Sequence, residues 1–156
     1  MIRKTQKKIG EILVAKGLIT EKQLQEALIQ QRKNKKFLGE ILIENYSIME
    51  KDLLEVLSEQ FDIEVISLKN KYIDWSFVKG FSSSLILDHK CFPVKTDERT
   101  ITIAIINPLD VWALKKSEDE SKGLRVIWVL VSQKDMQEAI QKYQQYIRGN
   151  ISNLFK

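Results

Sequence analysis

The chain has 156 residues, of which 44% are hydrophobic, and this is enough for one good core or two small ones. Its formal net charge of +4 comes from both halves, since residues 1–60 carry 11 basic and 9 acidic side chains and residues 61–156 carry 14 basic and 12 acidic ones. This small excess of positive charge allows an anionic ligand but does not indicate nucleic acid. The single cysteine, Cys91, excludes an intramolecular disulfide and favours the cytoplasm, and no segment approaches the roughly 18 uncharged apolar residues that a membrane helix needs.

The first 60 residues contain an internal repeat at a fixed offset of 29 residues. The two copies span residues 8–31 and 37–60 and agree at 11 of 24 positions, where chance would give roughly one or two. A duplicated unit of this length predicts a pseudo-symmetric surface. The identical pairs are Gly10/Gly39, Glu11/Glu40, Ile12/Ile41, Leu13/Leu42, Ile19/Ile48, Glu21/Glu50, Lys22/Lys51, Leu24/Leu53, Glu26/Glu55, Leu28/Leu57 and Gln31/Gln60.

The first copy predicts two helices around a tight turn. Ile9, Ile12 and Leu13 share one helical face. Gly17 then supplies a left-handed stop, and the segment Thr20–Gln23 is a capping box that opens the second helix. The inner face of that helix is Leu24, Ala27, Leu28 and Gln31.

The second copy repeats this pattern with a different turn. Tyr46 replaces the glycine, and we expect the neighbouring Asn45 to take the left-handed conformation. Ser47 and Glu50 predict a displaced capping box. Two units are too few for an open solenoid, so they should form a compact four-helix unit. The inner faces here are Leu38, Ile41 and Leu42, then Leu53, Val56, Leu57 and Gln60.

Two basic runs flank the first copy, and both are typical of solvated segments: a tail and the turn between the copies. They are Arg3-Lys4 with Lys7-Lys8, and Arg32-Lys33 with Lys35-Lys36.

Beyond residue 60 the pattern changes to alternating strands and helices. The segment Ile63–Leu68 predicts a short strand or an extended connector, and we place the domain boundary after it. The fold class is therefore α+β: a four-helix unit from two helix-turn-helix repeats in residues 1–68, then a small α/β sandwich domain in residues 69–156. Its expected elements are a helix at 84–89, strands at 92–94 and 100–106, a turn at 107–110, a helix from Asp110 through Ser117, a strand at 125–131, and a final helix capped by Ser132 with the face Met136, Ala139, Ile140, Tyr143 and Ile147.

Signals of catalysis are absent from the sequence. It contains no phosphate-binding G-x-x-x-x-G-K-[ST] loop and no G-x-G-x-x-G motif. The only histidine, His89, lies two residues from Cys91, and this spacing favours a structural pair over a catalytic dyad. One Cys and one His are too few ligands for a metal site. The three tryptophans are scattered, which favours core or rim positions. We expect a protein that is not an enzyme and holds no cofactor.

The motif begins with Lys8-Ile9-Gly10 in the first copy and with Phe37-Leu38-Gly39 in the second. In each copy regularly spaced leucines and a closing glutamine, Gln31 or Gln60, follow, and a five-residue spacer separates the copies. This motif resembles the cyclic di-GMP-binding MshEN-type module at the N-terminus of assembly ATPases in type II secretion and type IV pilus systems. The second half resembles the domain that follows this module, with Pro93-Val94, the strand at 100–106, the 107–110 turn and a final helix containing Tyr143 and Tyr146. The resemblance spans residues 8–147. The ATPase domain of the family does not occur in these residues, so we expect a stand-alone homologue or one part of a split architecture.

The resemblance implies a regulatory or adaptor protein with cyclic di-GMP as its ligand and no catalytic role. Its implied partners are a platform protein of the secretion or pilus machinery and a separate assembly ATPase, with neither nucleic acid nor direct membrane insertion. It would act in the cytoplasm, peripheral at the inner membrane through a partner. The ligand-binding residues it implies are Lys8, Ile9, Gly10, Leu13, Gly17, Leu24, Leu28 and Gln31 in the first copy and Phe37, Leu38, Gly39, Leu42, Leu53, Leu57 and Gln60 in the second.

Three positions depart from the family motif and leave a second hypothesis open. Lys8 and Phe37 stand where each motif begins with arginine, and Tyr46 stands where the first copy has glycine. Lysine cannot reproduce a bidentate guanidinium, phenylalanine carries no charge, and tyrosine would crowd a close approach to the backbone. The alternative is an interaction module that has lost nucleotide binding and binds only protein.

Overall fold

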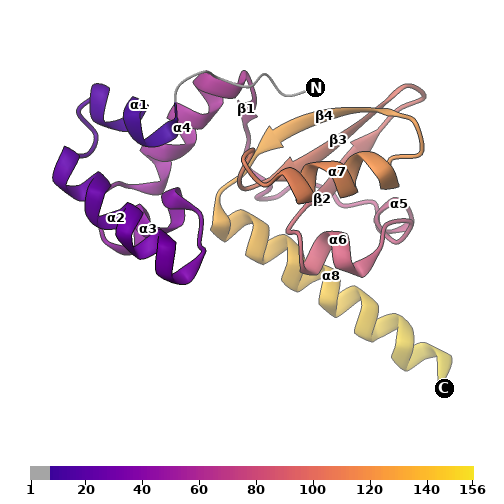
Figure 1. The fold of residues 1–156 in the computed structure, drawn as a ribbon. Coiled ribbons are helices and arrows are strands. Elements are labelled where there is room, and N and C mark those ends of the chain that lie inside the picture. Colours follow the sequence, from indigo (N-terminus) through magenta and orange to yellow (C-terminus); the bar gives the residue numbers. More distant parts are fainter. Residues whose placement is uncertain (1–7) are drawn as a thin grey trace. The chain divides into compact units, whose positions relative to one another are not determined.

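The computed structural model describes residues 8–156 (Figure 1). Arg3, Lys4 and Lys7 of the basic run at the N-terminus lie outside the described residues. The chain divides into two compact units, residues 1–62 and 63–156. The division comes earlier than the boundary we expected after residue 68, because strand β1 (Glu64–Val65) pairs with a strand of the second unit.

The first unit contains the four predicted helices: α1 (Ile9–Ala15), α2 (Glu21–Asn34), α3 (Leu38–Glu44) and α4 (Glu50–Phe61). Each copy of the repeat gives a seven-residue helix followed by a longer one, of 14 residues in α2 and 12 in α4. The centre of the unit is fully buried and holds Leu13, Ile41 and Leu42. Apolar residues at helical spacing therefore build the core of this unit, as the periodicity predicts.

The turn in the first copy has the geometry that the sequence predicts. Gly17 has a φ of 71°, in the left-handed region. Thr20 and Gln23 form the capping box: the Gln23 backbone N–H donates to Thr20 Oγ1 at 3.1 Å, and the Thr20 N–H donates to Gln23 Oε1 at 2.8 Å. A reciprocal cap of this kind satisfies two backbone donors at the start of α2.

In the second copy the prediction for the turn is wrong. Tyr46 itself has a left-handed φ of 56°, while Asn45 has a φ of −79°. The reason is the hydrogen-bond register of the helix end. The N–H groups of Tyr46 and Ser47 donate to the carbonyls of residues 43 and 42, as those of Gly17 and Leu18 donate to residues 14 and 13. This pattern requires a left-handed residue at position 46, whatever its side chain.

The displaced capping box at Ser47 is also wrong. Helix α4 begins at Glu50, with Met49 as an N-cap that makes no side-chain hydrogen bond. Met49 corresponds to Thr20 of the first copy, and the residues before them, Ile48 and Ile19, are both buried. Burial of this isoleucine thus fixes where the helix begins in each copy.

The second unit is built on a four-stranded mixed sheet in the order β1-β4-β3-β2. Its other strands are β2 (Phe92–Thr96), β3 (Thr100–Ile105) and β4 (Arg125–Leu130). Strand β4 pairs in parallel with β1 and β3, and β2 pairs antiparallel with β3, with a register shift between Pro93 and Lys95. Successive residues of β3 from Ile101 to Ile105 are all buried, so both faces of the sheet are covered there.

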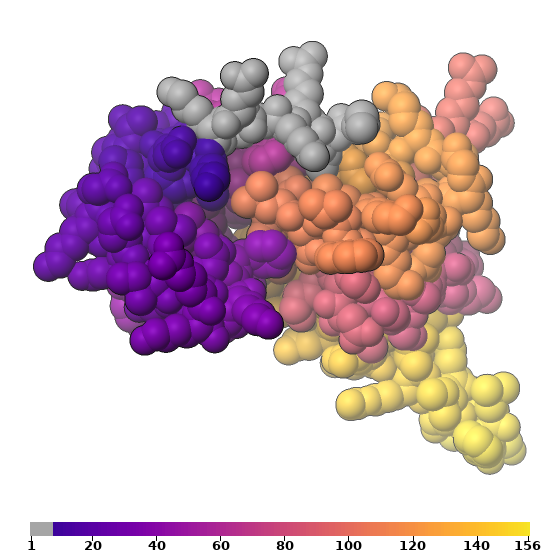
Figure 2. Space-filling model, in the orientation of Figure 1, coloured from indigo at the N-terminus to yellow at the C-terminus, as the bar shows by residue number. Residues whose placement is uncertain are grey.

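Four helices complete this unit: α5 (Trp75–Val78), α6 (Ser83–Leu87), α7 (Val111–Glu120) and α8 (Gln133–Leu154). Asp110 and Ser132 cap α7 and α8 through backbone N–H groups, as predicted. Helix α5 was not predicted, α7 runs to residue 120, and α8 continues beyond Ile147. The end of α8, yellow in Figures 1 and 2, projects beyond the sheet, and residues 148–156 are exposed.

One core cluster joins α5, α6 and α8 to the sheet. It includes Val78 and Ile86 from the short helices, Ala104 and Val129 from the strands, and Tyr143 from α8. Of the tryptophans, Trp128 is buried, but Trp112 is 76% exposed and is no core anchor. Within the described residues, no helix is both long enough and apolar enough to span a bilayer.

Candidate functional site

The two glycines that begin the motifs lie in equivalent contacts. A Cβ atom at Gly10 would lie 2.6 Å from Leu24 Cδ1, and one at Gly39 would lie 2.7 Å from Leu53 Cδ2. Both distances are shorter than a side-chain contact allows. Each glycine therefore lets the short helix of its copy approach the leucine of the following helix, with the same 14-residue separation in both copies.

Many of the motif residues form the core of the unit rather than its surface. Leu38 adds a contact between the copies, since its Cδ2 would lie 3.2 Å from a Cβ at Gly10. Such residues have apolar side chains that the helices bury against one another. The buried members of the predicted site are Gly10, Leu13, Leu24, Leu42, Leu53 and Leu57.

The surface part of the predicted site centres on the helix starts. Lys8 and Phe37 are the N-caps of α1 and α3, with φ and ψ of −68° and 145° in Lys8 and −67° and 144° in Phe37. Lys8 is exposed, and Phe37 is 37% exposed. The two copies thus hold a cation and an aromatic ring on equivalent backbones. Ile9, Leu28, Gln31, Leu38, Gly39 and Gln60 are also partly exposed.

The two glutamines that close the motifs differ in their contacts. The Gln31 side-chain amide donates to the Lys36 carbonyl oxygen at 3.0 Å, across the turn between the copies. The Gln60 side chain makes no hydrogen bond within residues 8–156. One amide therefore holds the turn, while the other keeps its donors and acceptor for solvent or a ligand.

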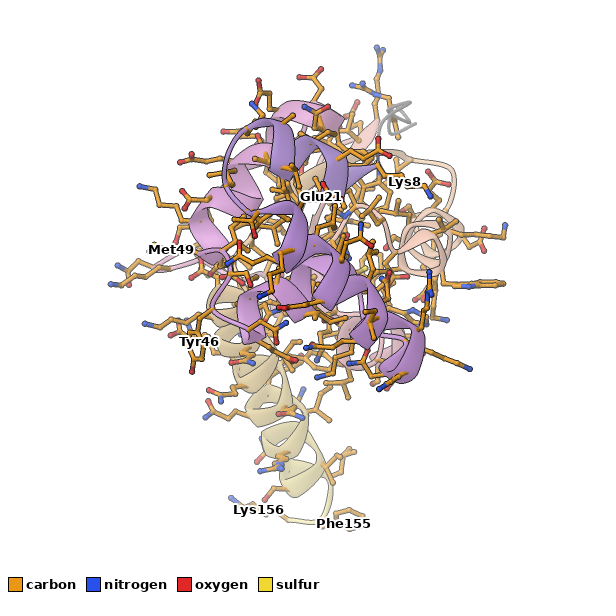
Figure 3. All side chains as sticks on the ribbon, turned by 60° about the vertical axis from the view of Figure 1, so that its left-hand side comes forward. Lys8, Glu21, Tyr46, Met49, Phe155 and Lys156 are labelled. Atoms are coloured by element: carbon orange, nitrogen blue, oxygen red, sulfur yellow. The ribbon has the colours of Figure 1, made fainter. Side chains whose placement is uncertain are left out.

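The two turn residues of the repeat, Gly17 and Tyr46, are both exposed. Gly17 is exposed, and a Cβ there would meet no atom within 4 Å, so its left-handed φ alone explains the glycine. Tyr46 is 96% exposed. Figure 3 shows Tyr46 and Lys8 on opposite sides of the first unit in that view.

Charged side chains in this unit are partly neutralised. Lys16 Nζ lies 2.8 Å from Glu59 Oε2, and Lys36 Nζ lies 2.7 Å from Glu44 Oε1. The hydrogen bond to Glu44 and the charge of that carboxylate raise the pKa of Lys36. The basic run at 32–36 is exposed, as expected of a solvated turn.

The Cys91 thiol lies in the second unit and is buried. Its Sγ lies 3.5 Å from the His89 carbonyl oxygen and 3.8 Å from that of Ala113, and the single S–H can donate to either. Burial raises the pKa of this thiol to about 11. A thiol that is protonated at neutral pH and donates to carbonyls is a poor nucleophile. Among the described residues, no cluster of three or more Cys, His, Asp or Glu could hold a metal.

Residues 61–150, more than half of the chain, match the MshEN domain. This match lies almost entirely in the second unit, whereas we expected the MshEN-type module in the repeat at residues 8–60. The chain belongs to the MshEN domain family. The type IV pilus assembly ATPase PilB of Myxococcus xanthus (strain DK1622) is 28% identical to it over 139 residues. That alignment covers 87% of this chain but only 24% of PilB, so the chain spans about a quarter of the length of this relative.

Solved structures show the same fold. A structure of MshE with cyclic di-GMP (cdg) has a TM-score of 0.77 at 25% identity and covers 88% of this chain and 99% of its own. The N-terminal domain of XpsE has a TM-score of 0.70 at 15% identity, with 88% and 97% covered. The second unit, residues 63–156, makes up only 94 of the 156 residues. An alignment with MshE that covers 88% of the chain must therefore also include much of the repeat in the first unit.

Two features of the site were missed from the sequence. The contact of Leu38 with Gly10 joins the two copies, and its only signal is that a leucine precedes Gly39. The use of Gln31 in the turn has no sequence signal, because the identical Gln60 makes no such bond.

Proposed function

We propose that this protein is a non-enzymatic regulatory or adaptor protein that docks on type II secretion or type IV pilus machinery and binds cyclic di-GMP through residues 8–60. The observation that carries the proposal is the equivalence of the two copies. Both have an extended N-cap and a Gly–Leu contact of the same geometry, and a two-fold symmetric dinucleotide suits such a pair. The likeness to MshE with cyclic di-GMP supports the ligand.

The accessible side chains supply suitable chemistry. Ile9, Leu28 and Leu38 offer apolar contacts for a guanine, and the Lys8 ammonium offers a charge to a phosphate. The Gln60 amide, which makes no hydrogen bond within residues 8–156, can both donate and accept. The buried residues of the motif would act by holding this surface in shape. Docking on the machinery would bring the protein to the cytoplasmic face of the inner membrane through its partner.

Calorimetric titration with cyclic di-GMP tests the nucleotide site, with GMP as the control ligand. Gln60→Ala should weaken binding about tenfold, whereas Gln141→Ala, on exposed α8 of the second unit, should leave it unchanged. Phe37→Arg should strengthen binding about tenfold, because it adds a guanidinium at an N-cap already in place. Absence of heat with folded protein at high micromolar ligand would contradict the proposal.

The second candidate function is binding of protein only. The observation that favours it is that Gln31 is occupied by the Lys36 carbonyl and that neither Lys8 nor Phe37 is arginine. Under this alternative the titration is silent, but the protein still captures a secretion or pilus component. If the protein captures no secretion or pilus component from native cytosol and membranes, this result would count against docking under both candidate functions.

A further inference from the structure

The second unit carries a groove that the repeat does not explain. Three parts of the chain form its wall. The segment between β1 and α5 contributes Lys71 and Tyr72, the start of α5 contributes Trp75, and α8 contributes Lys142. A narrower apolar cleft shares Lys71, Tyr72 and Ile73 with this groove, so the two lie next to each other, and we call them together the hollow. Apolar residues of β2 and α8, including Phe92 and Ala139, line the cleft.

Packing holds the groove in a fixed shape. The Trp75 ring stacks on Tyr146, with centroids 5.0 Å apart and planes 10° apart, and meets Phe92 edge-on at 6.4 Å. Asp135 of α8 holds the segment that leads into the groove, because the Leu68 N–H donates to its Oδ2 at 2.7 Å. Pre-organised walls lower the cost of ordering on binding.

The charges of the groove favour an anionic partner. Lys71 and Lys142 are exposed, and neither makes an ion pair within the described residues. The acidic residue of the lining, Asp74, is engaged at the start of α5, where its Oδ1 accepts from the Ser76 hydroxyl at 2.6 Å. Two ammonium groups therefore face the groove against the one carboxylate of its lining, which leaves a net positive charge.

Tyr72 adds an apolar surface that the fold leaves open. It is 89% exposed at the junction of groove and cleft. Exposed aromatic rings beside a pocket are typical of the anchors of protein interfaces.

We propose that this hollow binds an acidic peptide segment of a partner protein that carries one apolar anchor. The anchor packs on the exposed Tyr72 ring and on Ile73 at the mouth of the cleft, and flanking carboxylates pair with Lys71 and Lys142. This surface lies entirely in the second unit, so the proposal stands independently of nucleotide binding by the repeat.

Fluorescence anisotropy on the full chain tests this with a dye-labelled peptide that has Leu-Phe between two short runs of glutamate. Two control peptides replace glutamate by lysine, or Leu-Phe by Ser-Ser. The variant Lys71→Glu/Lys142→Glu should weaken binding at least about tenfold. The matched control Lys79→Glu/Lys115→Glu makes the same change of charge at exposed lysines outside the hollow and should bind as the wild type does.

Tyr72→Ala changes an exposed side chain and should weaken binding several-fold without loss of folding. Absence of peptide binding at high micromolar protein would overturn the proposal, as would equal binding by the two charge-reversed variants. Equal binding of the Ser-Ser peptide would also overturn it, since the hollow would then attract any polyanion.

Discussion

Replacing Tyr46 by glycine should stabilise the first unit, although it removes a large side chain. The Tyr46 backbone has a φ of 56°, and its side chain is 96% exposed, so almost no packing is lost. A left-handed conformation costs a non-glycine residue roughly 1–2 kcal/mol. Glycine loses roughly 0.5–1 kcal/mol more backbone entropy on folding. The expected net stabilisation is therefore about 1 kcal/mol.

Hydrogen exchange read by mass spectrometry measures this locally. The amides of residues 46 and 47 close the end of α3, so peptides that cover α3 and α4 report the stability of the turn. A gain of about 1 kcal/mol corresponds to roughly fivefold slower exchange through opening of the unit. Local exchange is preferable to global melting, because the chain has two units that need not unfold together.

Two variants make the comparison specific. Gly17→Ala places a Cβ in open space at a φ of 71° and should destabilise its turn by about 1 kcal/mol. Tyr72→Gly removes an equally exposed tyrosine whose φ is not positive, and should speed exchange around residue 72. If Tyr46→Gly instead speeds exchange in α3 and α4, backbone strain does not govern this turn.

Three further outcomes follow from the contacts. Gln31→Ala should destabilise the first unit by about 0.5–1.5 kcal/mol through loss of its bond across the turn, whereas Gln60→Ala should leave it unchanged. Hydrogen exchange in peptides that cover α2 and α3 measures the difference. Burial raises the pKa of the Asp135 carboxyl, but hydrogen bonds, led by that from Leu68 N–H, lower it more, so the net pKa lies below its usual range. Asp135→Asn should therefore speed exchange of the Leu68 amide at neutral pH. The difference from wild type should shrink as the pH falls from about 3.9, the ordinary pKa, through the lowered pKa of the native carboxyl, where the carboxylate becomes protonated. The Cys91 pKa of about 11, against an ordinary 9.0, should slow reaction with a disulfide reagent at pH 8 by roughly a hundredfold relative to urea-unfolded protein; fast native labelling would contradict its burial.

Local sequence signals predicted the helices of the repeat and most elements of the second unit. Periodicity and caps are local, and Thr20, Asp110 and Ser132 each cap the helix expected of them. Helix α5 was missed because four residues are too short to show a period, and its only signal was Asp74. The pairing of β1 with β4 joins residues 65 positions apart, and no local pattern specifies such a pairing.

The candidate site was only partly predictable for a related reason. The offset of 29 correctly paired the helix starts and the Gly–Leu contacts. It could not distinguish Gly10, which a close approach requires, from Gly17, which a left-handed φ requires, because both are simply glycine in the sequence. Nor could it separate buried Leu24 from partly exposed Leu28, since burial depends on how neighbouring helices pack.

The residues that differ between the copies lie on backbones that do not differ. Lys8 and Phe37 are both extended N-caps, and Gly17 and Tyr46 are both left-handed. Equivalent isoleucines, leucines and glycines are buried or closely packed in both copies, so the interior determines the backbone, and the exposed positions remain free to vary. A symmetric scaffold can therefore persist while its two halves acquire different chemistry. A two-fold ligand on this unit would meet an ammonium in one half and an aromatic ring in the other.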